Sequence, residues 1–201
     1  METQATLLQA LQALYHDPNA DTRSAANQWL QEFQHSLEAW QISDNLLHNQ
    51  SSTLEAHYFC AQTLRTKIQR DFDDLPTSSR ILLRDSVLIL IKRFQHGPPS
   101  VRTQLCLALA ALAIHISAED WGKGGVMKWL KEELNSTNEG ISSLLELLTV
   151  LPQVSICDGV FLQRCYTFAP EYLTALEDEF ADLKQKGMPV LSYSYKLLTL
   201  D

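Results

Sequence analysis

The chain has 201 residues, of which 45% are hydrophobic and 20% charged, a composition typical of a folded, water-soluble protein and not of a disordered one. Glycine and proline number only seven each, so few positions interrupt regular structure and long helices are favoured. The net charge is −8, and the acidic beginning of the chain argues against a nucleic-acid surface there, because phosphates require clustered lysine and arginine. We therefore expect no direct nucleic-acid partner.

The charge is unevenly distributed along the chain. The segment 1–64 has one basic residue, Arg23, and its acidic residues are Glu2, Asp17, Asp21, Glu32, Glu38, Asp44 and Glu55. The basic residues of the next segment, 65–93, are Arg65, Lys67, Arg70, Arg80, Arg84, Lys92 and Arg93. The acidic segment could receive a basic protein partner, although an ordinary solvated surface has the same pattern.

The cysteines and the apolar runs indicate the compartment. Cys60, Cys106, Cys157 and Cys165 have no CxxC spacing, and no signal peptide precedes them. Free thiols in the cytosol or nucleus are the simplest account. The longest apolar run, 105–114, has about half the length that a bilayer requires, so we expect a buried helix and no membrane insertion.

Apolar residues at three- and four-residue steps predict helices at 3–15 and 18–34, separated by a break at 16–19. Pro18 suits the first turn of the second helix, where its missing N–H costs nothing. Ser36 is predicted to cap a third helix.

The fourth helix has the clearest start, since Ser52 and Glu55 have the spacing of a capping box, in which each side chain binds the other's backbone N–H. The break at 71–74 ends it. Its apolar stripe comprises Tyr58, Ala61, Leu64 and Ile68.

The fifth helix is predicted to begin at 75–77 and to end before Gly97. Its residues in register are Leu82, Asp85, Leu88 and Ile91. A sixth helix, capped by Ser100, is apolar around most of its circumference over 105–116, which predicts that neighbours cover it on more than one side. A glycine-rich joint at 121–125 follows, then helices at 125–135 and 138–151, the second ended by Pro152.

The predicted helices recur as pairs, about every 35 to 40 residues, which is the period of HEAT repeats. The expected fold is all-α: a HEAT-repeat α-solenoid of four to five repeats, built as a right-handed stack of antiparallel helix pairs. A single compact helical bundle is the alternative. The pairs are 3–34, 36–70, 77–116 and 118–151.

Several segments resemble a known family. They are 25–34 (AANQWLQEFQ), Ala39-Trp40, Leu46-Leu47, 59–68 (FCAQTLRTKI), 69–72 and 118–121. The chain is similar in these segments to the N-terminal repeats of the importin-β nuclear transport receptors, most of all to the transportin-SR branch and its plant members. The resemblance covers about residues 1–152.

The resemblance implies a receptor that works in both cytoplasm and nucleus. In that family the first repeats bind the GTP form of the small GTPase Ran along the concave face, and later repeats hold cargo. For the transportin-SR branch the cargo is serine/arginine-rich splicing factors, and nucleoporins are further expected partners. We find no resemblance after residue 152, so we expect a truncated receptor whose divergent helical tail, 153–201, covers the open end of the stack.

The resemblance also suggests a binding site. If second helices line the concave face, the polar stripe of the fourth helix faces the channel and binds Ran, although each residue singly fits a solvated face equally well. The stripe comprises Gln62, Arg65, Thr66 and Gln69.

Metal and catalytic sites are weaker interpretations. His57 and Cys60 are spaced to share a metal ion, but no second pair matches them, so a buried cysteine beside an incidental histidine is the better reading. His115 is read as a helix-end residue and not a general base. The glycines at 122, 124 and 125 lack the strand and the Gly-Lys-Ser/Thr of a phosphate loop. The tryptophans, read as packing residues, are Trp29, Trp40, Trp121 and Trp129.

These patterns predict no enzyme, no cofactor and no metal site. The leading hypothesis is the Ran-binding part of an importin-β-like receptor. The alternative is a helical scaffold or decoy that keeps the repeats but transports nothing.

Overall fold

The computed structural model describes residues 2–116 together with Asp120 and Trp121. Within these residues every regular element is a helix, which confirms the expected all-α class. The elements are α1 (Glu2–His16), α2 (Ala20–His35), α3 (Glu38–His48), α4 (Leu54–Asp71), the 3₁₀ turn η1 (Phe72–Asp74), α5 (Thr77–Arg93) and α6 (Pro99–His115). The helices expected at 125–135 and 138–151, the joint at 122–125 and the tail 153–201 lie outside the described residues.

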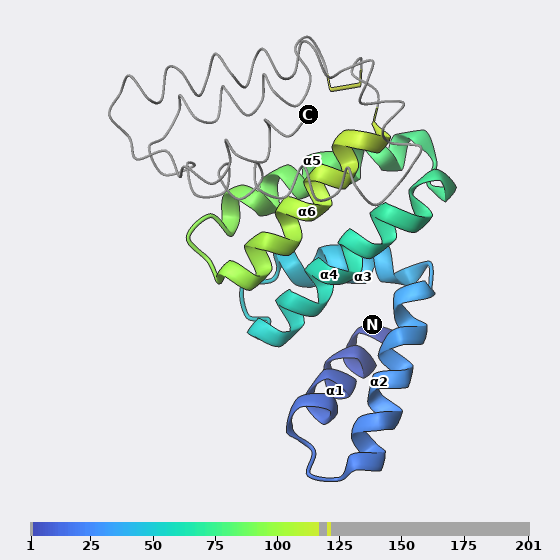
Figure 1. Ribbon diagram of the computed structural model, residues 1–201, viewed down its shortest axis with the longest axis vertical. Helices are drawn as coiled ribbons and strands as arrows, with labels where there is room; N and C mark the ends of the chain where they lie inside the picture. Colours follow the sequence, from blue (N-terminus) through green and yellow to red (C-terminus); the bar gives the residue numbers. More distant parts are fainter. Residues whose placement is uncertain (1, 117–119, 122–201) are drawn as a thin grey trace, which may run out of the picture.

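The helices form successive hairpins, α1 with α2, α3 with α4 and α5 with α6, and the hairpins are stacked (Figure 1). α4 packs against its own partner α3 and, still more extensively, against α6 of the next hairpin. Each hairpin therefore completes its core with a neighbour, which is how HEAT-type solenoids are built. The first three predicted pairs are confirmed.

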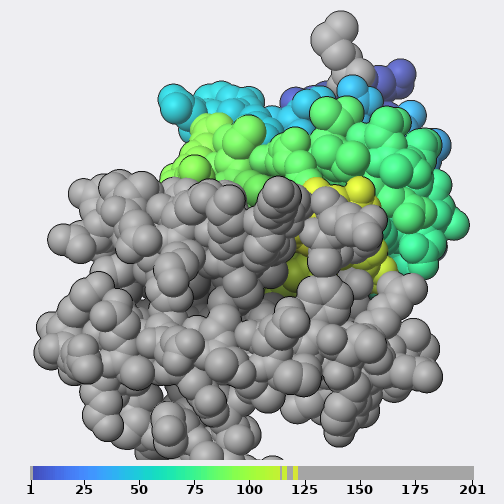
Figure 2. Space-filling model, turned by 90° about the horizontal axis from the view of Figure 1, so that it is seen from above, coloured from blue at the N-terminus to red at the C-terminus, as the bar shows by residue number. Residues whose placement is uncertain are grey.

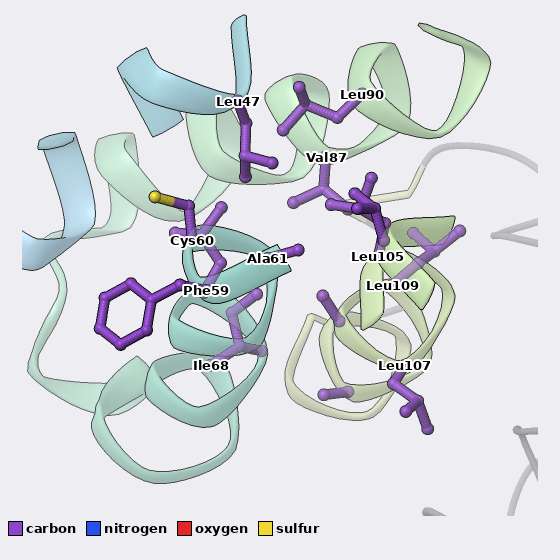
Figure 3. Close-up of a cluster of buried hydrophobic side chains, with 14 of the residues drawn as sticks. Leu47, Phe59, Cys60, Ala61, Ile68, Val87, Leu90, Leu105, Leu107 and Leu109 are labelled. Carbon is purple, nitrogen blue, oxygen red and sulfur yellow. The ribbon is translucent and has the colours of Figure 1, made fainter. Parts of the chain in front are cut away.

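The core extends through all six described helices, and Figure 3 shows the part of it that lies around α4 and α6. α6 supplies an unbroken buried run from Leu105 to Leu112, so neighbours cover most of its circumference, as its sequence predicts. Leu64, Cys60 and Ile68 of α4 are fully buried. Side chains that meet in this core include Leu47, Ala61, Val87, Leu90 and Leu109.

The start of α4 differs from the sequence prediction by one residue. Thr53, not Ser52, is the N-cap, and its hydroxyl oxygen accepts a hydrogen bond from the N–H of Ala56 at 3.3 Å. Glu55 binds back through the Thr53 hydroxyl and its own backbone N–H, and these bonds lower the pKa of its carboxyl group. Ser52 Oγ is buried and has no hydrogen-bond partner in the described part of the chain.

Other helix starts also differ. Asn19 caps α2 by accepting from the N–H of Asp21 at 2.8 Å, so Pro18 precedes the helix instead of occupying its first turn. Ser100 lies inside α6, where Pro99 takes the first-turn position that proline favours. At α3 the N-cap is Leu37, one residue after the predicted Ser36, although the Ser36 hydroxyl still accepts a hydrogen bond from the N–H of Ala39 at 3.2 Å.

The predicted register of α5 is only partly correct. Ile91 is buried and Leu88 packs partly buried against the core, but Leu82 is 69% exposed and Asp85 is also exposed. Val87 and Leu90, which lie outside the predicted set, are buried. Figure 2 shows the outer side of α5, in green, at the surface. The helix has apolar residues on more than one face, and its packing against α6 selects which of them enter the core.

Polar contacts also join successive hairpins. The Gln34 amide of α2 donates to the Thr63 hydroxyl of α4 at 3.1 Å. On the other side of the stack, His48 Nε2 of α3 lies 2.8 Å from the Ser86 hydroxyl of α5, and that hydroxyl also donates to Asp44. These buried or half-buried groups are hydrogen-bonded across the junctions, which fixes the register of neighbouring hairpins.

Among the described helices, none is long and apolar enough to cross a membrane.

Candidate functional site

The predicted polar stripe forms a single strip along α4. Gln62, Arg65, Thr66 and Gln69 are all partly buried, and their spacing of three, four and seven residues brings them to one side of the helix. Core residues such as Leu64 and Ile68 occupy the other side. We call these four residues the α4 strip.

Arg65 is held at the boundary between α4 and α6. Its Nη1 donates a hydrogen bond of 3.1 Å to Oε1 of Gln104 on α6. Its Nε lies below the surface and has no hydrogen-bond partner in the described part of the chain. The guanidinium group is therefore oriented by one contact and keeps unused donors.

Gln104 was not among the site residues predicted from the sequence. Its position is the one signal in the sequence, because it is a polar residue one step before the apolar run that begins at Leu105. A polar side chain at the border of a buried helix face commonly has a partner on the neighbouring helix.

Lys67 lies next to this strip in sequence but does not contribute to it. Its side chain is 3% exposed, its Nζ lies 2.8 Å from Asp71 Oδ2, and the same nitrogen lies 5.0 Å from the centre of the Trp40 ring. A buried ammonium group needs such a partner. Lys67 therefore stabilises the junction of α3 and α4 instead of presenting charge to solvent.

Other basic residues of the segment 65–93 also make internal contacts. Arg80 donates to the carbonyl oxygens of Leu75 at 2.8 Å and Asp73 at 2.6 Å, and Arg84 donates to the carbonyl of Asp120. Arg93 donates to the carbonyl of His48. The basic run seen in the sequence is thus used largely for packing and capping, and Arg65 is the charged residue of the α4 strip.

His57 and Cys60 have separate environments. Burial raises the pKa of the Cys60 thiol to about 12. The His57 ring packs edge-on against Phe94 at 5.1 Å, and its Nε2 lies 3.0 Å from the Asn49 carbonyl. The described residues contain no group of three or more histidine, cysteine or acidic side chains that could hold a metal ion.

His115 and the tryptophans have packing roles. The His115 ring lies 5.0 Å from that of Phe72. Trp29 stacks on Phe33 at 5.6 Å, and the Arg84 guanidinium lies over Trp121 at 5.7 Å. With Trp40 partly buried against the core, the packing prediction is confirmed for the tryptophans at 29, 40 and 121. Trp129 lies outside the described residues.

Stacked helical hairpins with a shared core and a polar strip on a central second helix define a helical-repeat protein of the binding class. Comparison with known proteins agrees, because residues 26–93 match the importin-beta N-terminal domain. Transportin MOS14 of Arabidopsis thaliana is 44% identical over 200 residues, covering 100% of this chain and 20% of that protein. The chain belongs to the importin-β family.

Importin-13 proteins are also similar. The mouse protein is 38% identical over 148 residues, covering 72% of this chain and 15% of its own length. The chicken protein is 32% identical over 201 residues, covering 91% of this chain and 21% of its own length. The chain thus spans about a fifth or less of the length of these relatives, and their names describe transport proteins, not enzymes.

The Arabidopsis match continues past residue 152 to the end of the chain. The expectation that the resemblance ends at residue 152 is therefore wrong. The tail contains none of the short segments that mark the family in 1–152, so its relationship is visible only in the identity over the full 200 residues.

Proposed function

We propose that this chain forms the Ran-binding N-terminal part of a nuclear transport receptor. The observation that carries the proposal is the position of the α4 strip, since all four of its residues lie inside the segment 26–93 that matches the importin-beta N-terminal domain. The function is recognition of a protein partner, and no bond is made or broken.

The partner for this strip is the GTP form of Ran. Because Gln62, Arg65, Thr66 and Gln69 are half-buried and mostly uncharged, they suit contact with a folded protein surface more than long-range attraction of a polyanion. The acidic residues of α1 to α3 supply attraction for basic groups of the same partner. Exposed charges are screened over about 10 Å at 0.1 M salt, so the association weakens as salt rises.

The wider role is nuclear import, with exchange between cytoplasm and nucleus. The relatives are named transportin and importin, and the resemblance to the transportin-SR branch extends the proposal to serine/arginine-rich cargo and to nucleoporins as transient partners. Cargo binding belongs to the whole receptor, of which the chain spans a small part.

The test is a pull-down with Ran loaded with GTP or with GDP. We expect the 201-residue chain to retain the GTP form preferentially and to lose it progressively at higher salt. A scaffold or decoy that lacks the receptor's recognition predicts no nucleotide preference. Equal retention of both forms, or of neither at high protein concentration, would leave only that second function.

A further inference from the structure

A hydrogen bond at the boundary between α4 and α6 extends beyond the segment that matches the family. Arg65 belongs to the matched segment 26–93, whereas Gln104, which binds it, lies beyond it on α6. We infer that Arg65 and Gln104 together form a receptor for a carboxylate group on the surface of GTP-bound Ran, with Gln104 as a positioning residue. This inference rests on the proposed function.

The unused donors of Arg65 point to an anion. A guanidinium group has five N–H donors, and one of them is used by Gln104. Nε lies below the surface without a partner in the described part of the chain, which is an unfavourable state for a donor attached to a charged group. Because Nε lies below the surface, a partner's carboxylate would bind at the terminal Nη groups of the partly exposed side chain, where it would neutralise the charge.

The surroundings favour a single carboxylate over a nucleic acid. The other residues of the α4 strip, Gln62, Thr66 and Gln69, are neutral, and the neighbouring Lys67 is buried against Asp71. A polyphosphate backbone needs several cations in a row, which the strip does not offer. One oriented guanidinium group suits one acidic side chain of a folded protein.

The chemistry of Gln104 explains its role. Its amide oxygen accepts a hydrogen bond from Arg65 and so fixes the plane of the guanidinium group. Because the amide is neutral, it leaves the positive charge available to a partner. A glutamate at the same position would fix the group equally well but would neutralise it.

The experiment compares Gln104→Glu with a charge-matched control in the full chain. Gln9, which is exposed on α1, supplies the control variant Gln9→Glu with the same change in net charge. The dissociation constant for GTP-bound Ran is measured by isothermal titration calorimetry, and the melting temperature by circular dichroism. We expect Gln104→Glu to weaken binding by roughly tenfold or more without lowering the melting temperature, and Gln9→Glu to leave binding near that of the unchanged chain.

A double-mutant cycle tests whether Gln104 acts through Arg65. Gln104→Met removes the hydrogen bond while keeping similar bulk. It should weaken binding when it is the only substitution, and it should have no further effect in a chain that already carries Arg65→Ala. Additive effects of the two substitutions would contradict a positioning role.

The outcomes separate the two proposals. If the unchanged chain prefers GTP-bound Ran but Gln104→Glu binds as well as Gln9→Glu, the carboxylate receptor is wrong and the proposed function remains. If the unchanged chain shows no nucleotide preference, the proposed function fails, and the carboxylate receptor fails with it.

Discussion

Thr53 begins α4 through its hydroxyl group, whose oxygen accepts a hydrogen bond from the N–H of Ala56. The backbone N–H of Glu55 and, next, the Thr53 side chain lower the pKa of the Glu55 carboxyl group. Ser52, one residue earlier, has a buried hydroxyl without a partner in the described residues. Serine and threonine are both favoured N-cap residues, so backbone geometry at the end of the preceding loop determines which of the two caps α4.

The cap gives the first prediction. Thr53→Ala should lower the free energy of unfolding by about 0.5–2 kcal/mol, because it removes the side-chain cap of a central helix. Ser52→Ala, its matched control, should cost less, since its hydroxyl has no bond to lose. Urea unfolding followed by circular dichroism measures both. A larger fall in the free energy of unfolding for Ser52→Ala would mean that Ser52 caps the helix, as the sequence predicted.

The same cap should depend on pH. The folded-state pKa of Glu55 is lowered from 4.5 by the hydrogen bonds at its own backbone N–H and at Thr53. A lowered folded pKa means that the ionised carboxylate contributes stability above 4.5 and that this contribution is lost as the pH falls through the folded pKa. The difference between Thr53→Ala and the unchanged chain should therefore shrink below 4.5.

Arg65→Glu gives the second prediction, for binding. Reversing the charge in the α4 strip should weaken retention of GTP-bound Ran and alter its dependence on salt. Because Arg65 is partly buried and bonded to Gln104, the substitution should also affect stability. We expect the free energy of unfolding to fall by about 0.5–1.5 kcal/mol, the usual net value of one hydrogen bond. Unfolding and binding assays on the same variant separate the two effects.

At the scale of the helix, burial is decided by how each face meets its neighbours. α4 has neighbours on both sides, and its predicted core positions Ala61, Leu64 and Ile68 are fully buried. α5 packs mainly against α6, so one face enters the core and Leu82 and Ile89 remain exposed. Both helices have apolar residues at helical spacing, yet their exposure differs.

Leu64 and Leu82 form a matched pair for the third prediction. Leu64→Ala should cost about 2–5 kcal/mol, because Leu64 is completely buried and the structure cannot fully collapse around the cavity. Leu82→Ala removes the same atoms from a side chain that is 69% exposed and should change stability by about 0.5 kcal/mol or less. Comparable losses in urea unfolding would mean that the register of α5 differs from the one described.

The pair of Lys67 and Asp71 gives the fourth prediction. Asp71→Ala leaves a 3% exposed ammonium group without its carboxylate partner and should cost about 1–3 kcal/mol. Lys67→Met keeps the bulk of the side chain against Trp40 and leaves an Asp71 that water can reach, so its cost should be smaller. Thermal unfolding of both variants tests the order, and the reverse order would show that the ion pair is not what matters at this junction.

At the scale of the whole molecule, stability comes from contacts between adjacent hairpins. α4 joins the second hairpin to the third through α6, and the Gln34–Thr63 bond joins the first to the second. Such a stack has no single centre, so binding surfaces extend along the second helices instead of gathering in a pocket.

The fifth prediction concerns shape. Repeats that contact only their neighbours produce an elongated particle, so small-angle X-ray scattering of the chain should give a radius of gyration above that of a compact protein of equal length, about 2.2·N^0.38 Å. Circular dichroism should show strong helical signal. A compact scattering profile would favour the single-bundle alternative that the sequence also allowed.

Local features of this chain were readable from its sequence. The periodicity of residues 3–15, the break at 71–74 and the apolar run from Leu105 each depend on nearby residues, and each is present as predicted. The pairing of helices followed from their spacing, since short connections force neighbours to run antiparallel. The four residues of the α4 strip share a face because helical geometry alone puts them there.

The tertiary structure decided everything that depends on a neighbour distant in the sequence. The exposure of Leu82 and the burial of Lys67 each depend on the helices packed around them. The contact of Arg65 with Gln104 joins residues 39 positions apart, and no local pattern predicts such a pair. Periodicity describes which side chains one helix can bury, whereas the helices packed against it determine which of them it does bury.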